Sequence, residues 1–233
     1  MGSFYNLASS VVRRIYDRRI DTPPVLDPQT FFPNFVRYAE RWRELRDEAL
    51  QIACELHKVP RFHDLMQAQA DISDNDGREW RMFIVKAYGV RIEDNLGRCP
   101  TLSRLLEQTP EVSSACFSFV APHKHIPLHR GPFRGILRFH LGLSVPFAAD
   151  GRPGTVLTID GVDHRIGDGD TLLWDDTCLH ELRNDADQVR VALLLDVRRP
   201  GMPLDMQLLS GMLMHGTAGV IRARRSATPY LLG

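Results

Sequence analysis

Three absences limit what this chain of 233 residues can be. It has no excess charge of either sign, because Lys plus Arg and Asp plus Glu both number 29, so no overall field favours nucleic acid as a partner. Its four cysteines include no CxxC pair, which predicts reduced thiols and argues against a thiol zinc site. No run of 18 apolar residues occurs, so we expect no membrane-spanning helix and a cytoplasmic location.

The residues that are present have an ordinary globular balance, with 43% apolar and 25% charged residues. This is enough for a full core with helical extensions. Between residues 78 and 200, short β-branched or aromatic stretches are bounded by Gly, Pro or Asp, which predicts a mainly β core of the double-sheet jelly-roll, cupin-like type. The expected strands are Arg81–Tyr88, Cys116–Val120, Ile136–Val145, Thr155–Ile159, His164–Ile166, Thr171–Trp174 and Val189–Val197.

Helical patterns flank this core, giving an N-terminal extension over residues 1–77 and a C-terminal helical tail over 201–233. The simplest role for these helices is packing on the core or on a second copy, and the oligomeric state is left open. The amphipathic character of residues 1–20 and 203–225 gives an alternative, which is peripheral contact with a membrane surface. The expected helical segments are residues 1–20, 27–57, 61–69 and 203–222.

Two distant histidines carry the strongest chemical signal. His129 stands in His129-Arg130-Gly131, and His180 follows Trp174-Asp175-Asp176. Iron(II) in oxygen chemistry needs imidazole ligands on one side and open positions on the other. A lone His is more often structural, so the pair counts only together. Gly131 stands where a carboxylate ligand would be expected, and His123 and His125 are expected near the site or on the surface.

A second group of polar residues lies on apolar strands. Arg190, amid Val189–Val197, needs an anionic partner if it is buried. A protein carboxylate is one candidate, and a dicarboxylate cosubstrate is the other, because the guanidinium fork suits a carboxylate. Arg138 and His140 share one face of their strand, and Ser118 can add a hydroxyl group, so together they indicate a lined cavity.

With these motifs the chain resembles the aspartyl/asparaginyl β-hydroxylases, including bacterial relatives that 2-hydroxylate acyl chains of lipid A and ornithine lipids. The resemblance implies a double-stranded β-helix and an Fe(II)- and 2-oxoglutarate-dependent dioxygenase that consumes O2. It implies that His129 and His180 bind the iron, and that 2-oxoglutarate contacts Ser118, Arg138, His140 and Arg190. The matching segments are His129-Arg130-Gly131-Pro132, Leu137–Leu143, Gly169-Asp170, Trp174–Thr177 with His180, and Arg190 to Pro200.

Several alternatives stay open at this point. Residues 22–60 look like the lipid-acting branch, whereas Gly131 matches the animal enzymes, in which water replaces the carboxylate ligand; the substrate is therefore a lipid acyl chain, a small molecule, or a peptidyl Asp or Asn. An open iron position also accepts chloride, which would make a halogenase. A non-catalytic cupin-like carboxylate-binding module is the third candidate. Asp175 and Asp176 are expected to orient His180, and Arg130 and Arg134 to bind an anionic group or stay solvated.

Overall fold

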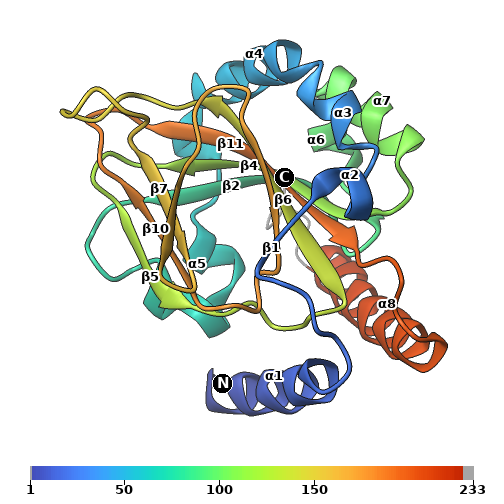
Figure 1. Ribbon diagram of the computed structural model, residues 1–233. Helices are drawn as coiled ribbons and strands as arrows, with labels where there is room; N and C mark the ends of the chain where they lie inside the picture. Colours follow the sequence, from blue (N-terminus) through green and yellow to red (C-terminus); the bar gives the residue numbers. More distant parts are fainter. Residues whose placement is uncertain (1, 228–233) are drawn as a thin grey trace.

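Two antiparallel sheets form the centre of the molecule (Figure 1). The computed structural model describes residues 2–227, with side chains placed for residues 10–223. The large sheet has the order β1 (Val25–Leu26), β9 (Thr171–Trp174), β6 (Ile136–Ser144), β11 (Arg190–Arg198), β4 (Val112–Val120), β2 (Trp80–Ala87) and β3 (Val90–Arg91). The small sheet has the order β5 (His125–His129), β10 (His180–Asn184), β7 (Thr155–Ile159) and β8 (Val162–Arg165). This architecture confirms the predicted jelly-roll class.

Alternation along the central strands separates an apolar outer face from a polar inner face. On β11, Val191, Leu193 and Leu195 pack in the main hydrophobic core, and the intervening positions belong to the opposite face of the sheet. Arg190 and Asp196 lie on that opposite face. The register of β11 against β4 and β6 brings the equivalent polar positions of the neighbouring strands beside them. The alternation along these strands thus places polar side chains on the inner face of the large sheet, toward the inside of the barrel.

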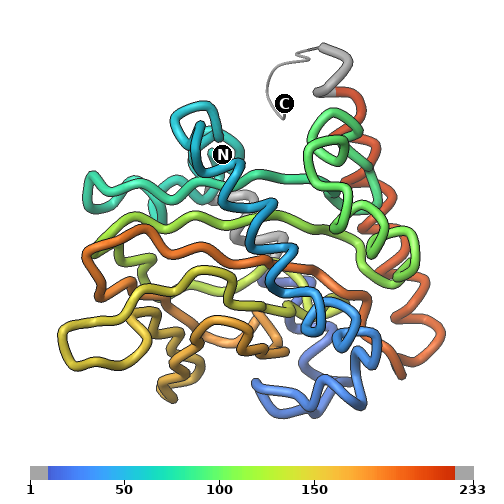
Figure 2. The backbone as a smooth tube through the Cα atoms, turned by 90° about the horizontal axis from the view of Figure 1, so that it is seen from above, coloured from blue at the N-terminus to red at the C-terminus, as the bar shows by residue number. Residues whose placement is uncertain are grey.

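Short helices cover the outer face of the large sheet (Figure 2). The single long helix expected over residues 27–57 is wrong, because the chain forms three helices there. Asp27 caps the first of them and Pro28 opens it, but Phe32 precedes Pro33 and leaves the helical region. The helices on this face are α2 (Pro28–Phe31), α3 (Phe35–Ala39), α4 (Trp42–Ala53), α6 (Glu93–Gly97) and α7 (Pro100–Gln108).

The helical ends of the chain lie together beneath the barrel. Helix α1 (Gly2–Asp17) and helix α8 (Leu204–Ala227) match the helices expected from the sequence, and both pack on the turn between β5 and β6 through a small apolar cluster. Residues 228–233 of the predicted tail lie outside the described residues. No helix in the described part of the chain is both long and apolar enough to cross a bilayer. The remaining helical segments are η1 (Leu56–Lys58), α5 (Phe62–Leu65) and η2 (Gln67–Ile72).

The small sheet was only partly predicted. Its strands β5 and β10 are missing from the expected strands, and each carries one of the two candidate iron-binding histidines. The segment that ends at His180 follows strand β9, as expected, and His180 itself begins strand β10. Strand β1, from the N-terminal segment, adds an edge to the large sheet by pairing with β9. The site is therefore built by both sheets and by the loop that joins β9 to β10.

Candidate active site

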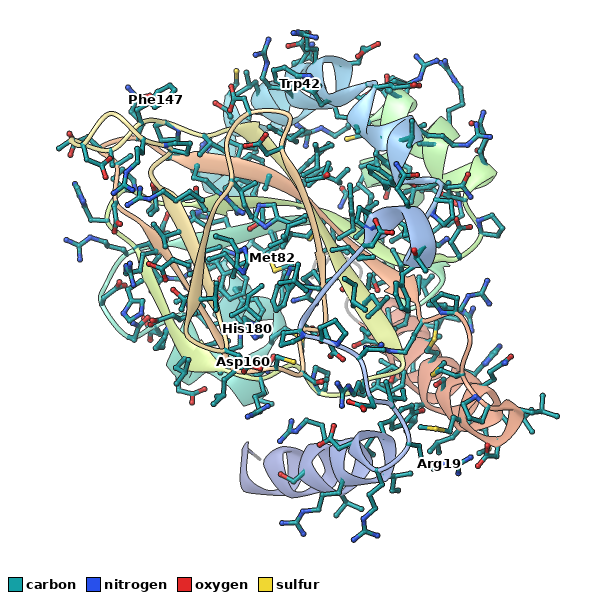
Figure 3. The ribbon with its side chains drawn as sticks, viewed as in Figure 1. Arg19, Trp42, Met82, Phe147, Asp160 and His180 are labelled. Carbon is teal, nitrogen blue, oxygen red and sulfur yellow. The ribbon has the colours of Figure 1, made fainter. Side chains whose placement is uncertain are left out.

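The two histidines lie side by side on neighbouring strands of the small sheet. His129 and His180 are directly paired in the antiparallel register of β5 and β10, and their ring centroids lie 4.0 Å apart. The Trp174 ring packs edge-on against His180 at 4.5 Å. Figure 3 shows His180 at the end of the barrel nearest α1. Two segments far apart in sequence thus place their imidazoles in contact.

Both imidazoles are held in the form that binds a metal. The Nδ1 of His129 lies 2.8 Å from the carbonyl oxygen of Pro127, and the Nδ1 of His180 lies 2.9 Å from that of Cys178. A carbonyl oxygen only accepts, so each Nδ1 carries the hydrogen and each Nε2 keeps its lone pair. Burial lowers the pKa of both rings, which keeps them neutral at pH 7. These carbonyls, and not the expected carboxylates of Asp175 and Asp176, orient the histidines.

A carboxylate fills the space beside Gly131. A Cβ atom added at Gly131 would lie only 2.4 Å from Cγ of Asp176. The Gly131 N–H donates to the main-chain oxygen of Asp176 at 2.6 Å, so the two loops are closely joined. Asp176 is 1% exposed, and its Oδ1 has no hydrogen-bond partner among the described residues. Burial raises the pKa of Asp176 to about 7. The space that a side chain at position 131 would take is therefore occupied by the carboxyl group of Asp176, from the loop after β9.

The donor set fits a metal with two protein ligands. Among the described residues, no three His, Cys, Asp or Glu side chains form a metal-binding group. The two free Nε2 lone pairs nevertheless lie side by side on one wall of the barrel. Imidazole ligands with open remaining positions suit iron(II) and cosubstrate binding. His123 and His125 do not contribute, because their Nε2 atoms lie within hydrogen-bond distance of the carboxylates of Asp187 and Glu181 respectively.

Arg190 is a buried cation with no carboxylate beside it among the described residues. Its side chain is 1% exposed; Nη2 donates to Nε2 of His140 at 2.5 Å, and Nη1 lies 3.4 Å from Oγ of Ser118. Its Nε has no partner among the described residues. Trp80 Nε1 also donates to Ser118, at 3.1 Å. Burial lowers the pKa of Arg190 to about 9, so the group is still a cation at neutral pH. A buried cation without an anion is costly, and a ligand carboxylate would offset that cost.

His140 completes this centre by being neutral. Its ring is 1% exposed, and burial, with the charges of Arg190 and Arg138, holds its pKa well below the usual value. The neutral Nε2 can therefore accept from Arg190 and fix one arm of the guanidinium fork. The sequence grouped Ser118, His140 and Arg190 together, and the structure places them in contact.

Arg138 lies apart from that group. Its Nε and Nη2 donate to Oδ1 of Asp196 at 3.0 Å and 2.9 Å, and Nη2 lies 3.2 Å from Oδ2 of Asp176. These carboxylates raise the pKa of Arg138 despite its burial. The positive charge is thus already balanced by protein groups. Contact between Arg138 and 2-oxoglutarate remains a prediction.

Asp175 has a structural role beside the site. It is fully buried and pairs with both Arg134 and Arg199, while its Oδ1 accepts from the main-chain N–H and the hydroxyl of Thr177. Arg134 is therefore engaged inside the protein and is not available for an anionic group, contrary to expectation. Arg130 is exposed and donates to the carbonyl oxygen of Thr177 at 2.7 Å.

Known proteins share this combination of features. The family model described as Aspartyl/Asparaginyl beta-hydroxylase matches residues 39–200. The chain is 33% identical over 185 residues to the ornithine lipid ester-linked acyl 2-hydroxylase of Rhizobium tropici, covering 78% of this chain and 63% of that protein. It is 27% identical over 178 residues to human aspartyl/asparaginyl beta-hydroxylase, covering 74% of this chain and 22% of that protein.

The chain thus spans less than two thirds of the length of these relatives. Among solved structures, a predicted oxalate decarboxylase from Thermotoga maritima is 13% identical with a TM-score of 0.32, over 52% of this chain and 81% of that one. The family match covers most of the described barrel and includes both histidines and Arg190. The chain belongs to the aspartyl/asparaginyl β-hydroxylase family.

Proposed function

We propose that this protein is an Fe(II)- and 2-oxoglutarate-dependent dioxygenase that hydroxylates an unactivated C–H bond in a lipid acyl chain. The observation that carries the proposal is the pair of neutral imidazoles in ring contact, with His180 buried and His129 partly buried, in the same barrel as a buried arginine that has no anionic partner among the described residues. Iron bound by His129 and His180 would supply the activation of O2 that oxidation of such a bond requires.

The cosubstrate would be held through its far carboxylate. Arg190 offers a guanidinium group whose Nε has no partner among the described residues, and Ser118 lies beside it with a hydroxyl group. Neutral His140 accepts from the guanidinium and limits its rotation, so the carboxylate would meet a preorganised donor set. Carboxylate binding at Arg190 would also compensate a charge that the described side chains leave without an anionic partner.

Asp176 favours hydroxylation over halogenation. Its carboxyl group occupies the space beside Gly131, where a third protein ligand would begin, and its Oδ1 is free to accept a hydrogen bond from a water molecule. With a pKa of about 7, about half of the Asp176 carboxyl groups are ionised at neutral pH, and this ionised fraction would repel chloride and favour a bound water molecule.

The proposed substrate class follows the greater similarity. The relative from Rhizobium tropici acts on an acyl chain of ornithine lipid, and it matches this chain at higher identity than the human protein does. A peptidyl Asp or Asn is the second candidate, since Gly131 is the feature expected of the animal enzymes. Both substrates would use the same histidines and the same cosubstrate pocket.

Mass-resolved product analysis tests the proposal. The protein is incubated with Fe(II), 2-oxoglutarate, ascorbate and air, with either a bacterial lipid extract or a pool of Asp- and Asn-containing peptides, while succinate is measured. One added oxygen in an acyl chain supports the proposal, and the same change in peptides assigns the second candidate. An added chlorine would identify a halogenase. Absence of succinate in every mixture would leave only a carboxylate-binding module.

The matched variants are His180→Ala and His125→Ala. Both remove an imidazole from the small sheet, but His125 is partly exposed and pairs with Glu181. We expect His180→Ala to abolish metal uptake and succinate formation, and His125→Ala to retain both. Full turnover by His180→Ala would overturn the iron-binding assignment.

A further inference from the structure

Figure 1 shows α1 beneath the barrel and α8 at its lower right; the end of α1 contacts the start of α8, and the two helices together are called the terminal layer. The hydroxyl of Tyr16 lies 2.7 Å from that of Ser210, and the guanidinium of Arg19 donates to both carboxylate oxygens of Asp205 at 2.7 Å and 3.1 Å. Tyr16 also packs edge-on against Phe133, in the loop after His129, with ring centroids 5.6 Å apart. The inner sides of the two helices are therefore buried against each other and against the core.

The outward sides of the same helices are apolar. Leu204, Leu208 and Met212 are 72%, 62% and 66% exposed and lie four residues apart, so they form one stripe along α8. On α1, Val11 and Ile15 are also four residues apart, at 50% and 45% exposed. Large exposed apolar side chains arranged in this way mark a surface that a protein partner or a membrane covers.

The charge of this layer identifies the occupant. Residues 2–20 and 204–227 contain seven arginines and two aspartates, a net charge of +5 in a chain whose total is zero. Arg14 and Arg18 are exposed and make no ion pair among the described residues. A second copy would bring the same positive charge to the contact and repel it. An anionic lipid surface satisfies both the apolar stripe and the arginines.

Helix α1 lies at the histidine end of the barrel. Arg13 of α1 donates to the carbonyl oxygen of Gly131 at 3.1 Å, two residues beyond His129, and α1 passes close to η2. Figure 3 shows His180 and Asp160 at this same end and Phe147 at the opposite end. We propose that the outward faces of α1 and α8 dock the protein on an anionic membrane and hold the histidine end of the barrel at the lipid surface. The role in lipid presentation rests on the proposed function, whereas the docking does not.

Vesicle co-sedimentation of the full chain tests the docking surface. The probes are vesicles of phosphatidylcholine alone or mixed with phosphatidylglycerol. We expect binding to the mixed vesicles that weakens as salt rises. Arg14→Gln with Arg18→Gln should weaken that binding about 30-fold. Leu204→Gln with Leu208→Gln should weaken it about tenfold or more.

A matched control removes the same chemistry from the other end of the barrel. Phe147 is 70% exposed, and Arg152 is exposed nearby in the same loop. The variant Phe147→Gln with Arg152→Gln should bind the mixed vesicles like the unaltered protein. An unchanged melting temperature shows that each variant is folded. Equal loss in the control variant, or no binding of the unaltered protein, overturns the proposal.

Two further readouts separate this inference from the proposed function. With lipid presented in detergent micelles, the α1 and α8 variants should form succinate at the unaltered rate, while on vesicles their rate should fall with their binding. Vesicle binding without lipid oxidation supports the docking surface and contradicts only the proposed function. Sedimentation that shows a dimer lost in Leu204→Gln with Leu208→Gln, without vesicle binding, assigns the surface to a second copy and overturns the proposal.

Discussion

Arg190 and Arg138 both lie on the inner face of the large sheet, Arg190 buried and Arg138 partly exposed, but their surroundings are opposite. Arg138 is balanced by Asp196 and Asp176, and its pKa is raised. Arg190 has a hydroxyl and a neutral imidazole as neighbours, and burial lowers its pKa to about 9. An unbalanced buried charge destabilises a fold unless it serves a ligand. Arg138 therefore stabilises the barrel, whereas Arg190 is suited to bind the carboxylate of a ligand.

The largest expected effect is on cosubstrate use by Arg190→Met. Removal of the buried charge that we propose binds the far carboxylate should lower kcat/KM for 2-oxoglutarate on the order of 10³-fold. The folded state should be equally stable or more stable by about 1 kcal/mol, because an unpaired buried cation is lost. Steady-state succinate assays and urea unfolding measure the two effects. Arg183→Met, on the partly exposed surface of β10, is the control, and a stability loss in Arg190→Met would contradict the comparison.

The second prediction concerns Arg138→Met. This change leaves Asp196 and Asp176 buried without their cation, and we expect it to lower the free energy of unfolding by about 3 kcal/mol. The partial exposure of Arg138, 26% for its side chain, places the loss at the lower end of the range for buried pairs. Arg138→Met combined with Asp196→Leu should recover part of that stability. If the double variant recovers no stability, the ion pair between Arg138 and Asp196 is not the source of the stability that Arg138 contributes.

The third prediction uses ligand binding to sharpen the same contrast. With Mn(II) in place of iron, 2-oxoglutarate at 100 times its Kd should stabilise the protein by about 2.7 kcal/mol. Arg190→Met should lose this gain at the same concentration, whereas Arg183→Met should keep it. Thermal unfolding with and without 2-oxoglutarate measures the difference. Equal stabilisation of Arg190→Met would place the cosubstrate elsewhere in the barrel.

The smallest expected effect is on pH dependence and involves His140. Its pKa is lowered in the folded state, so the unfolded chain binds more protons below pH 6.5 and stability falls as the pH drops toward the folded value. One such group contributes about 1.4 kcal/mol per pH unit within that window. His140→Gln keeps an acceptor for Arg190 and should reduce the slope by the share of His140, leaving the shares of His129 and His180. Urea unfolding at several pH values below 6.5 checks it, and an unchanged slope would mean that His140 is protonated in the fold.

Much of this arrangement follows from short-range patterns in the sequence. An arginine inside the apolar stretch Val189–Val197 must be buried, and Arg138 with His140 must share a strand face. The partners of Arg138 were not predictable in the same way. Asp196 meets it through the register of β6 and β11, and Asp176 meets it through a loop fold. Such pairings depend on distant segments and leave no local pattern.

The strands of the small sheet escaped prediction for a different reason. Strand β5 contains Pro127, which is tolerated because β5 lies at the edge of its sheet. Strand β10 reads His-Glu-Leu-Arg-Asn, with one apolar residue and partial exposure along its length. Neither stretch has the apolar content that identifies a strand. The polar residues on these strands, which include both candidate iron ligands, are the reason that neither strand was predicted from the sequence.

The close approach of Gly131 to Asp176 constrains how such a site can evolve. A change of Gly131 to Asp would place its Cβ against the carboxyl group of Asp176, so that carboxyl group would have to move before the new residue could supply a third ligand. Such a movement, or a change of Asp176 to a small residue, would open the space but would take one of two anions from Arg138. The two positions are therefore coupled: a His-x-Asp iron site on this loop would change the partners of an arginine on strand β6 as well as the ligands of the metal.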